Sequence, residues 1–519
     1  MGGTAPGTPS KSPLQEIIQP FIDMIHAPRA LWGINLAYFL EGWVYFGMLG
    51  YLAMHFSDFI FAGSANPDID SHHMVMFLTA GITISMFFLG SVADKKGIRK
   101  TLLMAFCCLL AGRIIWAAAP FVFTETGMWS NMHLMTMAGM LLVVIGYGMY
   151  QPAAYAGVRK FTTPKTAAMG FAMLYALMNL GGWLPTFFSP IRNAIGIAGS
   201  FWVYTAISAI ALIVTFFILT RKVEEKAVEQ VRLETANDEV KEEEKSEQKV
   251  IVVEDAKVPI HLLVTLLAVA AAALLLPAPF GYVVAGLLAL MVILLPMRIG
   301  FLQVAYTWLA NHPLSNTKFF FFIFALIPVQ TLFTYNWLIL PQYLERAFEG
   351  GFVSDNFEVF ANMNPILIFI AVPIITAITM KRNVYSMMII GTFVMAVPAF
   401  LLAIDTSIYT LLGYLLIMTI GEAMWQPRFL QYAAEIAPEG RTGAYMGVAQ
   451  FPWFLTKMVV PLYSGYMLQR FLPAKTEDVT DVVREPETMW LYFSLIAISS
   501  TIMLVLAKGW VGKDFKTKS

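Results

Sequence analysis

The sequence predicts an all-α protein that crosses a membrane many times and consists of two related halves. Of its 519 residues, 58% are hydrophobic and only 13% are charged, whereas a soluble domain carries about 25% charged residues. Apolar runs close to the ~20 residues that one membrane helix needs recur along the chain. Residues 146–152 (GYGMYQP) and 421–427 (GEAMWQP) also share Gly, Met, an aromatic residue, Gln and Pro in register. Such an internal repeat predicts two halves around a central site.

The N-terminal part of the chain is predicted to hold a tail, a first group of membrane helices and a linker. Residues 1–30 form a cytoplasmic tail, in which 14–25 are expected to be an amphipathic helix lying on the membrane. Residues 31–220 are expected to form a six-helix bundle, and the charged residues of 221–257 a solvated cytoplasmic linker. The helices of this bundle are placed at 31–54, 73–93, 101–120, 133–157, 167–189 and 200–220.

The C-terminal part is predicted to begin with two extra helices. Apolar runs on both sides of Pro277-Ala278-Pro279 predict a helical hairpin at 258–297, which we expect to pack outside the bundles. A connector at 298–317 leads to a second six-helix bundle at 318–508, and 509–519 form another cytoplasmic tail. The helices of this bundle are placed at 318–344, 358–380, 384–404, 408–434, 443–469 and 489–507. The expected order is therefore six, two and six membrane helices.

Positively charged residues predict the orientation of the chain. Lys95, Lys96 and Arg99 share one loop, and Arg159 and Lys160 share another, while the alternate loops hold mainly acidic residues. Loops on the cytoplasmic side of a membrane protein carry an excess of Lys and Arg. We therefore expect a multi-pass protein of the plasma membrane, monomeric in the lipid bilayer, with both termini in the cytoplasm.

Residues 90–100 (GSVADKKGIRK) join the second and third predicted helices. Gly90 lets these helices approach closely, and Asp94 can pair with a basic residue or a helix N-terminus across the loop. The segment resembles the signature loop of the major facilitator superfamily, G-x-x-x-D-(R/K)-x-G-x-(R/K)-(R/K). The resemblance implies the major facilitator fold and a gating role for this loop, with Gly90, Asp94 and Arg99 as the candidate residues.

Three more segments resemble motifs of the proton-coupled oligopeptide transporter family, which belongs to that superfamily. Residues 38–47 (YFLEGWVYFG) resemble its helix-one motif, 174–181 (LYALMNLG) its helix-five motif, and 421–427 the G-E-x-x-x-x-P pattern of its tenth helix. Bacterial members of the family also insert two extra helices between the halves. The resemblance implies proton-driven uptake of peptides by alternating access.

Three charges that are typical of the peptide transporters are absent. Tyr38 and Gly42 stand where the helix-one motif has an acid and an arginine, and Gln151 stands where helix four has a lysine before its proline. In the family these residues take part in binding the peptide carboxylate and in handling the proton. We therefore expect the solute to be peptide-like or another small polar molecule.

Five ionisable residues remain inside the predicted helices: Glu41, Arg113, Glu422, Arg428 and Lys457. Such a side chain costs ~3 kcal/mol or more at membrane depth and normally faces a partner or a water-filled cavity. Because a desolvated carboxyl group can take up a proton near neutral pH, Glu41 and Glu422 are the candidates for proton coupling. Lys457 is the expected counter-charge of Glu422, and Arg113 is a further counter-charge unless it extends to the membrane surface. The alternative is a set of static ion pairs that order the helices.

Polar and aromatic residues at the same depth are candidates to line a substrate cavity. Aromatic residues at helical spacing more often pack in a core, but the glutamines before the repeated prolines favour a cavity, because proline there frees backbone carbonyl groups. The candidates are Tyr38, Tyr45, Tyr150, Gln151, Tyr175, Asn179, Gln330, Asn336, Trp425, Gln426 and Trp453.

A secondary active transporter that couples solute and proton movement is the function that the sequence favours. An exporter or facilitator without proton coupling, or a receptor-like scaffold with the same fold, remains an alternative. A formal net charge of zero argues against nucleic acid as a partner. Cys107 and Cys108 are adjacent in an apolar run, where a disulfide or a metal site is not expected. Without a nucleotide-binding loop or spaced catalytic residues, we expect neither an enzyme nor a cofactor.

Overall fold

The computed structural model describes residues 27–89, 92–162, 167–239, 257–274, 280–379, 382–436, 438, 445, 447–474 and 483–511. All regular secondary structure in these residues is helical, which confirms the predicted all-α class. The predicted amphipathic helix at 14–25 and the centre of the charged linker lie outside the described residues.

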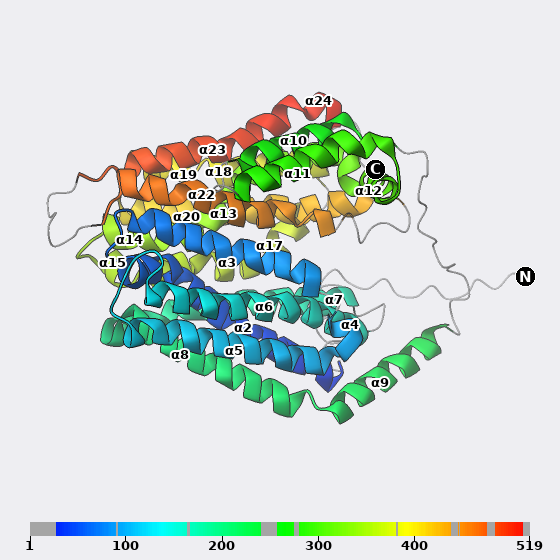
Figure 1. Cartoon of the computed structure of the whole chain (residues 1–519), viewed down its shortest axis with the longest axis horizontal. Coiled ribbons are helices and arrows are strands. Elements are labelled where there is room, and N and C mark those ends of the chain that lie inside the picture. Colours follow the sequence, from blue (N-terminus) through cyan, green and yellow to red (C-terminus); the bar gives the residue numbers. More distant parts are fainter. Residues whose placement is uncertain are drawn as a thin grey trace, which may run out of the picture.

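The first long helices lie side by side in the lower part of Figure 1. They correspond closely to the predicted apolar runs, because each run is long enough to satisfy its backbone hydrogen bonds within one helix. These helices are α2 (Arg29–His55), α3 (Pro67–Leu89), α5 (Ile98–Val122), α6 (Asn131–Lys160), α7 (Ala167–Trp183) and α8 (Ser189–Ile218), with the short α4 (Val92–Lys96) between α3 and α5.

A second group of helices fills the upper part of Figure 1. Its long members are α13 (Thr317–Leu338), α17 (Met363–Thr379), α18 (Val384–Ala396), α20 (Ile408–Glu435), α22 (Phe451–Phe471) and α23 (Pro486–Leu506). Shorter helices extend or connect them: α14 (Leu340–Ala347), α15 (Phe352–Asp355), α16 (Phe357–Ala361), α19 (Ala399–Ile404) and α24 (Lys508–Val511).

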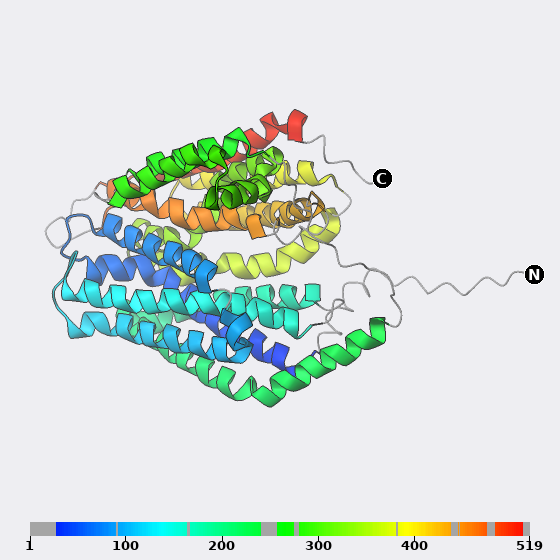
Figure 2. The ribbon, with the colours of Figure 1, turned by 45° about the vertical axis from the view of Figure 1, so that its right-hand side comes forward.

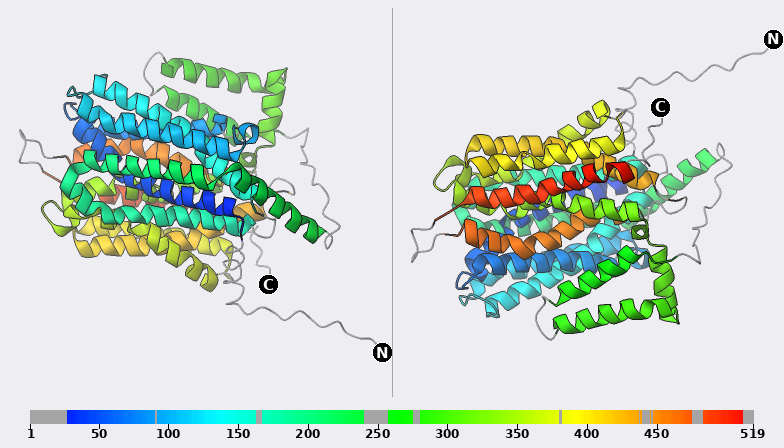
Figure 3. Two further views of the ribbon diagram at one scale, coloured as in Figure 1. Left: turned by 90° about the horizontal axis from the view of Figure 1, so that it is seen from below. Right: turned by 90° about the horizontal axis from the view of Figure 1, so that it is seen from above.

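Between the two groups, the described residues form four more α-helices. α9 (Arg221–Glu239) extends away from the bundle, as Figure 2 shows. α10 (Ile260–Ala273) and α11 (Phe280–Leu294) form an antiparallel hairpin, and α12 (Phe301–Ala310) turns away from α11 by 89°. Figure 3 shows that this hairpin lies at the outside of the molecule.

By length and composition, seven of the described helical segments can cross a membrane, or eight if α11 and α12 count as one bent span. This measure treats Ala176–Ile218, which includes most of α7 and all of α8, as a single segment. The chain is therefore a multi-pass membrane protein.

Short polar side chains begin several of these helices. Ser130 accepts a hydrogen bond from the His133 amide at the start of α6, and Asn316 accepts from two amides at the start of α13. Ser407 forms a capping box with Thr410 at the start of α20. Such caps satisfy amides that have no partner within the helix, so they help to place each helix start.

The repeated segments have the same packing role in both groups of helices. A Cβ atom added at Gly146 of α6 would lie 2.7 Å from Leu109 Cγ of α5. A Cβ atom added at Gly421 of α20 would lie 2.2 Å from the Met395 nitrogen of α18. Small residues allow membrane helices to approach this closely. The sequence repeat therefore corresponds to two equivalent close helix crossings.

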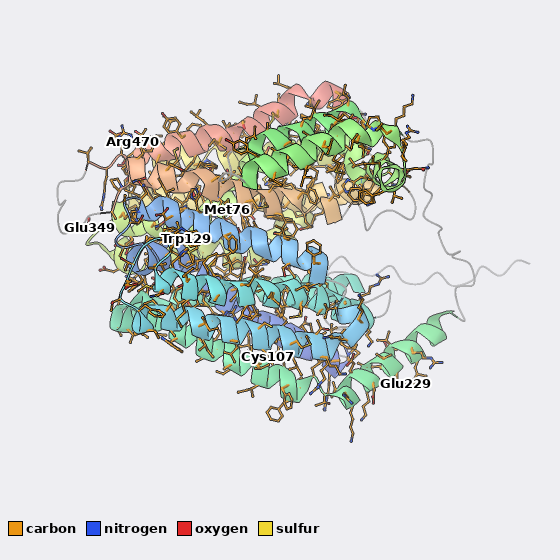
Figure 4. The ribbon with its side chains drawn as sticks, in the orientation of Figure 1. Met76, Cys107, Trp129, Glu229, Glu349 and Arg470 are labelled. Atoms are coloured by element: carbon orange, nitrogen blue, oxygen red, sulfur yellow. The ribbon has the colours of Figure 1, made fainter. Side chains whose placement is uncertain are left out.

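Among the described residues, the two groups of helices meet mainly along three pairs of long helices, with shorter contacts of α14 on α2 and of α16 on α8. α3 packs on α22, α7 on α17, and α2 on α13. The crossing of α3 and α22 is close, since a Cβ atom added at Gly465 would lie 2.6 Å from the Asp68 carbonyl oxygen. We call the end of the bundle near α14, marked by Glu349 and Arg470 in Figure 4, the α14 end. The opposite end, marked by Glu229, is the α9 end.

Candidate functional site

A cavity of about 90 Å³ lies between the two groups of helices. Most of its wall comes from α2, α3 and α6, and α22 closes the opposite side. Its only charged lining residues are Glu41 and Lys457, among the described residues. The lining consists of Tyr38, Glu41, Gly42, Tyr45, Thr79, Ile82, Thr83, Met86, Tyr147, Tyr150, Gln151, Met178, Phe454 and Lys457.

Glu41 is held in a buried ion pair. The Arg113 guanidinium donates to Glu41 Oε2 at 2.9 Å and to Oε1 at 2.5 Å. The Tyr147 hydroxyl donates to the same carboxylate, and Arg113 also donates to Ser208 Oγ at 2.6 Å. Arg113 is 2% exposed, so the alternative that it extends to the membrane surface is wrong. A bidentate pair of this kind is directional and strong.

Glu422 has neutral partners instead of a cation. It is 2% exposed and accepts hydrogen bonds from the Asn364 and Gln426 amides, each at 2.8 Å. Asn364 lies on α17, so this contact joins two helices of the C-terminal group. In this conformation Lys457 does not form the expected ion pair with Glu422, because α22 presents it to the central cavity. Glu422 is not among the residues that line this cavity.

Inter-helix ion pairs close the α14 end between the two groups. Arg346 of α14 binds Asp68 of α3 through two hydrogen bonds of 2.7 and 2.8 Å. Arg192 of α8 donates to Glu358 of α16 at 2.5 Å. We call these four residues the seal. Where both partners are described, polar contacts between the groups extend from this end only as far as Thr79, which donates to the Lys457 carbonyl at 2.9 Å.

Further polar side chains support the seal. The Tyr51 and Ser189 hydroxyls each donate to Glu358 at 2.8 Å, so one carboxylate receives three partners from the N-terminal group. His72 on α3 lies 2.9 Å from the Gln342 side-chain oxygen on α14. A buried carboxylate needs several donors to offset its loss of hydration. These contacts show that the described conformation is closed at the α14 end.

Comparison with known proteins identifies the family. Residues 31–344 match the sequence model of the Major Facilitator Superfamily. The chain belongs to this superfamily. A curated relative, the uncharacterized MFS-type transporter YttB of Bacillus subtilis (strain 168), is 25% identical over 123 residues. That alignment covers 23% of this chain and 31% of YttB, so the chain matches only about a third of the relative's length.

Solved structures with the same fold come from peptide transporters. A mutant of the peptide transporter POT in complex with sulfate has a TM-score of 0.63 and 15% identity, and the match covers 94% of this chain and 95% of that one. The POT family transporter PepTSo has a TM-score of 0.62 and 16% identity, with coverage of 95% and 99%. A POT family transporter in complex with a thioalcohol conjugated peptide has a TM-score of 0.62 and 15% identity, with coverage of 93% and 97%. At these identities the likeness shows the fold, and it confirms the predicted major facilitator architecture.

Superfamily membership places the chain in a superfamily of membrane transporters. Some of the predicted cavity residues of the N-terminal group do line the central cavity. Tyr38, Tyr45, Tyr150 and Gln151 line the central cavity, and the Tyr38 and Tyr150 rings stack with centroids 5.4 Å apart. Asn179 lies on α7 and is not a lining residue. The side chain of Tyr175 lies outside the description.

The predicted cavity residues of the C-terminal group lie elsewhere. Trp425 donates to the Met395 sulfur across the contact with α18, and Asn336 accepts from the Tyr414 hydroxyl at 2.9 Å. Gln330 is buried on α13 without a hydrogen-bond partner. Neither these residues nor Gln426 and Trp453 line the central cavity in this conformation. Aromatic residues such as Trp425 fill the bundle interior, which is the commoner use of an aromatic residue at helical spacing.

The candidate gating loop is only partly described. Gly90 lies outside the described residues, and Asp94 lies in α4, although its side chain is outside the description. Arg99 donates to the Leu219 carbonyl at 2.6 Å and lies 5.3 Å from the Phe216 ring centroid. Because cations are favoured at the C-terminus of a helix, Arg99 fixes the end of α8 at the α9 end.

If the seal acts as a gate, weakening it should make the central cavity more accessible to reagents from the α14 end. Arg346→Ala should increase the rate at which a membrane-impermeant thiol reagent modifies a Thr83→Cys probe in the cavity. We expect about a tenfold change or more, because removing one partner of a buried charge pair costs about 2–5 kcal/mol. Arg470→Ala is the matched control, since Arg470 is an exposed arginine at the same end. Equal modification rates in the two variants would contradict a sealing role for Arg346.

Glu345, next to this gate on α14, predicts that closure depends on pH. Burial and the nearby Asp58 raise the pKa of Glu345 from 4.5 to about 7, although Arg346 and Arg192 oppose the shift. Glu345 therefore binds a proton more tightly in the closed state than when it is hydrated in an open state. The negative charge of Glu358 also raises the pKa of Glu345. Closure should weaken as the pH rises from about 4.5 to 7 and then change little.

The same thiol probe, read between pH 5 and pH 8, measures this effect. Modification should become faster as the pH rises, and Glu345→Gln should make the profile flatter. Glu349→Gln is the control, because the Glu349 side chain is 51% exposed at the same end. If the Glu345→Gln profile has the same slope as the wild type, Glu345 is not the titrating group.

Proposed function

We propose that this superfamily member is a proton-coupled secondary transporter of peptide-like or other small polar solutes. The observation that carries the proposal is a polar cavity between the two groups of helices, closed at one end by ion pairs that join them. A site at the interface of two related halves is typical of alternating access. The helices of 31–220 and of 318–508 would then rock as two bundles, with the hairpin of 258–297 outside them.

The basic residues support an orientation for this movement. Lys96, Arg99 and Lys100 lie near the α9 end, close to Arg221 and Lys160 in one surface hollow. Because basic loops face the cytoplasm, we assign the α9 end and both termini to the cytoplasm of a plasma membrane. The α14 end then faces outward, and the described conformation is closed to the outside.

Glu422 is the acid best suited to carry the coupled proton. Burial disfavours the charged form of a carboxyl group, and two amides compensate it less than a cation does. Glu41 is different, because Arg113 and Tyr147 bind its carboxylate directly. We assign Glu41 to the positioning of Arg113 and Tyr147 at the cavity wall, and Glu422 to proton uptake.

Peptide-like solutes are proposed from the structural neighbours. One of those neighbours was solved with a bound peptide conjugate, and the fold is shared along almost the whole chain. Gln151 stands where that family's motif has a lysine, so this chain departs from the motif. The proposal therefore also includes other small polar solutes.

Reconstitution into proteoliposomes tests the proposal against its alternatives. Solute accumulation should require a more acidic outer compartment and should stop when a protonophore removes the gradient. Uptake that only equilibrates, with or without a gradient, would identify a facilitator. An absence of movement for dipeptides, amino acids and small organic acids would support a scaffold or receptor and refute transport.

A further inference from the structure

The central cavity offers hydrogen-bond donors that lack acceptors. The Tyr150 hydroxyl of α6 belongs to a residue that is 3% exposed, and it has no hydrogen-bond partner. Lys457 of α22 lines the opposite side, and its ammonium group makes no hydrogen bond or ion pair with the part of the chain that is described. An unpaired buried donor is costly, and an unpaired ammonium group at membrane depth costs more. Both groups therefore lack the acceptor that a bound solute would supply.

The carboxylate and one backbone carbonyl of the same wall already have donors. Glu41 receives two hydrogen bonds from Arg113 and one from Tyr147. An ammonium group of a solute could bind Glu41 only by displacing a bidentate arginine. The backbone carbonyl of Lys457 already accepts from Thr79. Because Glu41 is paired, the unpaired charge among the described lining residues is positive.

The rest of the wall is apolar or aromatic. Ile82, Met86, Met178 and Phe454 surround the polar groups, and the Tyr38 ring stacks on Tyr150. The volume of about 90 Å³ is smaller than the ~150 Å³ of a cavity that takes up benzene. In the closed state there is room for a small anionic head group and the first carbon atoms of its body.

We propose that the solute is a small organic carboxylate with an apolar body, whose carboxylate binds between Lys457 and Tyr150. This inference rests on the proposed transport function and names its substrate class. A positively charged amino group is not required for recognition, which distinguishes the site from one built to bind both ends of a peptide. Lys457 supplies the charge and Tyr150 a directional hydrogen bond from the other half of the protein, so a bound carboxylate would bridge the two halves.

Matched probes test this without a proton gradient. Purified full-length protein in lipid nanodiscs is titrated with 3-phenylpropionate, its neutral amide 3-phenylpropionamide and the cation 3-phenylpropylamine, and binding is followed by calorimetry and thermal shift. Butyrate and hexanoate, each with its amide, extend the panel to aliphatic bodies. At least one carboxylate should bind about tenfold more tightly than its amide, since a desolvated charge pair adds about 1.5 kcal/mol or more. The amine should not bind.

Variants locate the binding group. Lys457→Gln should lose the preference for carboxylate over amide, and Lys457→Arg should keep most of it. Tyr150→Phe should weaken carboxylate binding several-fold without lowering thermal stability, because its hydroxyl has no partner to lose. Tyr204→Phe is the matched control, since the Tyr204 hydroxyl is also buried without a partner but does not line the cavity.

The outcomes separate this inference from the transport proposal. If no carboxylate binds, if the amine or amide binds equally well, or if Lys457→Gln binds carboxylate like the wild type, the inference is overturned. Proton-driven uptake of another solute in proteoliposomes would still support transport in that case. Conversely, selective carboxylate binding without uptake supports the site while refuting the transport function.

Discussion

Arg113→Met should lower the free energy of unfolding by about 3–5 kcal/mol, because it leaves a buried carboxylate without its cation. Arg113 and Glu41 are both almost fully buried, and Arg113 supplies two of the hydrogen bonds to that carboxylate. Thermal and denaturant unfolding of the purified protein measure the loss. This is the largest stability effect that we expect from a single ion pair in the N-terminal group.

The double variant Glu41→Gln, Arg113→Met keeps this prediction testable even if the single variant does not fold. With the charge removed from both partners, most of the lost stability should return, since a buried pair can be replaced at little cost. Arg470→Met, at an exposed arginine, is the control for the loss of a guanidinium group. A double variant as unstable as Arg113→Met alone would show that Arg113 acts through contacts other than Glu41.

Glu422→Gln should abolish proton-driven accumulation while leaving solute exchange and expression intact. Glutamine keeps the size of the side chain and can retain contacts to the Asn364 and Gln426 amides, but it cannot gain or lose a proton. Accumulation against a gradient needs the proton, whereas exchange of labelled for unlabelled solute needs only the conformational change. Both are measured in the same proteoliposomes.

The matched control for this variant is Glu349→Gln, at an exposed acid of the α14 end. It should accumulate solute like the wild type. Normal concentrative uptake by Glu422→Gln would remove Glu422 from the coupling mechanism and would leave Glu41 as the other coupling candidate predicted from the sequence.

The helices could be predicted from the sequence because each apolar run must satisfy its own backbone hydrogen bonds in the membrane. The repeat was informative because its glycines lie where helices cross closely. Gly146 and Gly421 occupy equivalent helix crossings, so the repeated motif marks a close contact between two helices in each group. The bend of 89° between α11 and α12 left no comparable signal, although the connector that contains it was recognised.

Partners of the buried charges were harder to predict, because hydropathy does not show which face of a helix points inward. Glu41 and Arg113 were both recognised as buried charges, but their pairing depends on the rotation of α2 and α5. Lys457 was assigned to Glu422 because both lie at mid-depth in neighbouring runs, yet α22 turns Lys457 toward the N-terminal group. A one-residue change in helix phase rotates a side chain by about 100°, which is enough to change its partner.

The seal could not be found from the sequence. Asp68 and Arg346 are 278 positions apart, and Arg192 and Glu358 are 166 apart. Each was visible only as a charge at the end of an apolar run, where charged residues are ordinary. Two halves must be docked before such residues become neighbours, so the structure was needed to recognise them.

Alternating access requires the two halves to move apart at the α14 end, and a distance measurement between spin labels can detect this movement. Labels at Ala62→Cys and Phe352→Cys, both exposed positions near this end, would be placed on a background in which Cys107 and Cys108 are replaced by alanine. We predict one population at the short distance of the closed state and a second at a longer distance, which Glu358→Gln increases by releasing Arg192, Tyr51 and Ser189. A single distance, unchanged in Glu358→Gln, would contradict alternating access through this cavity.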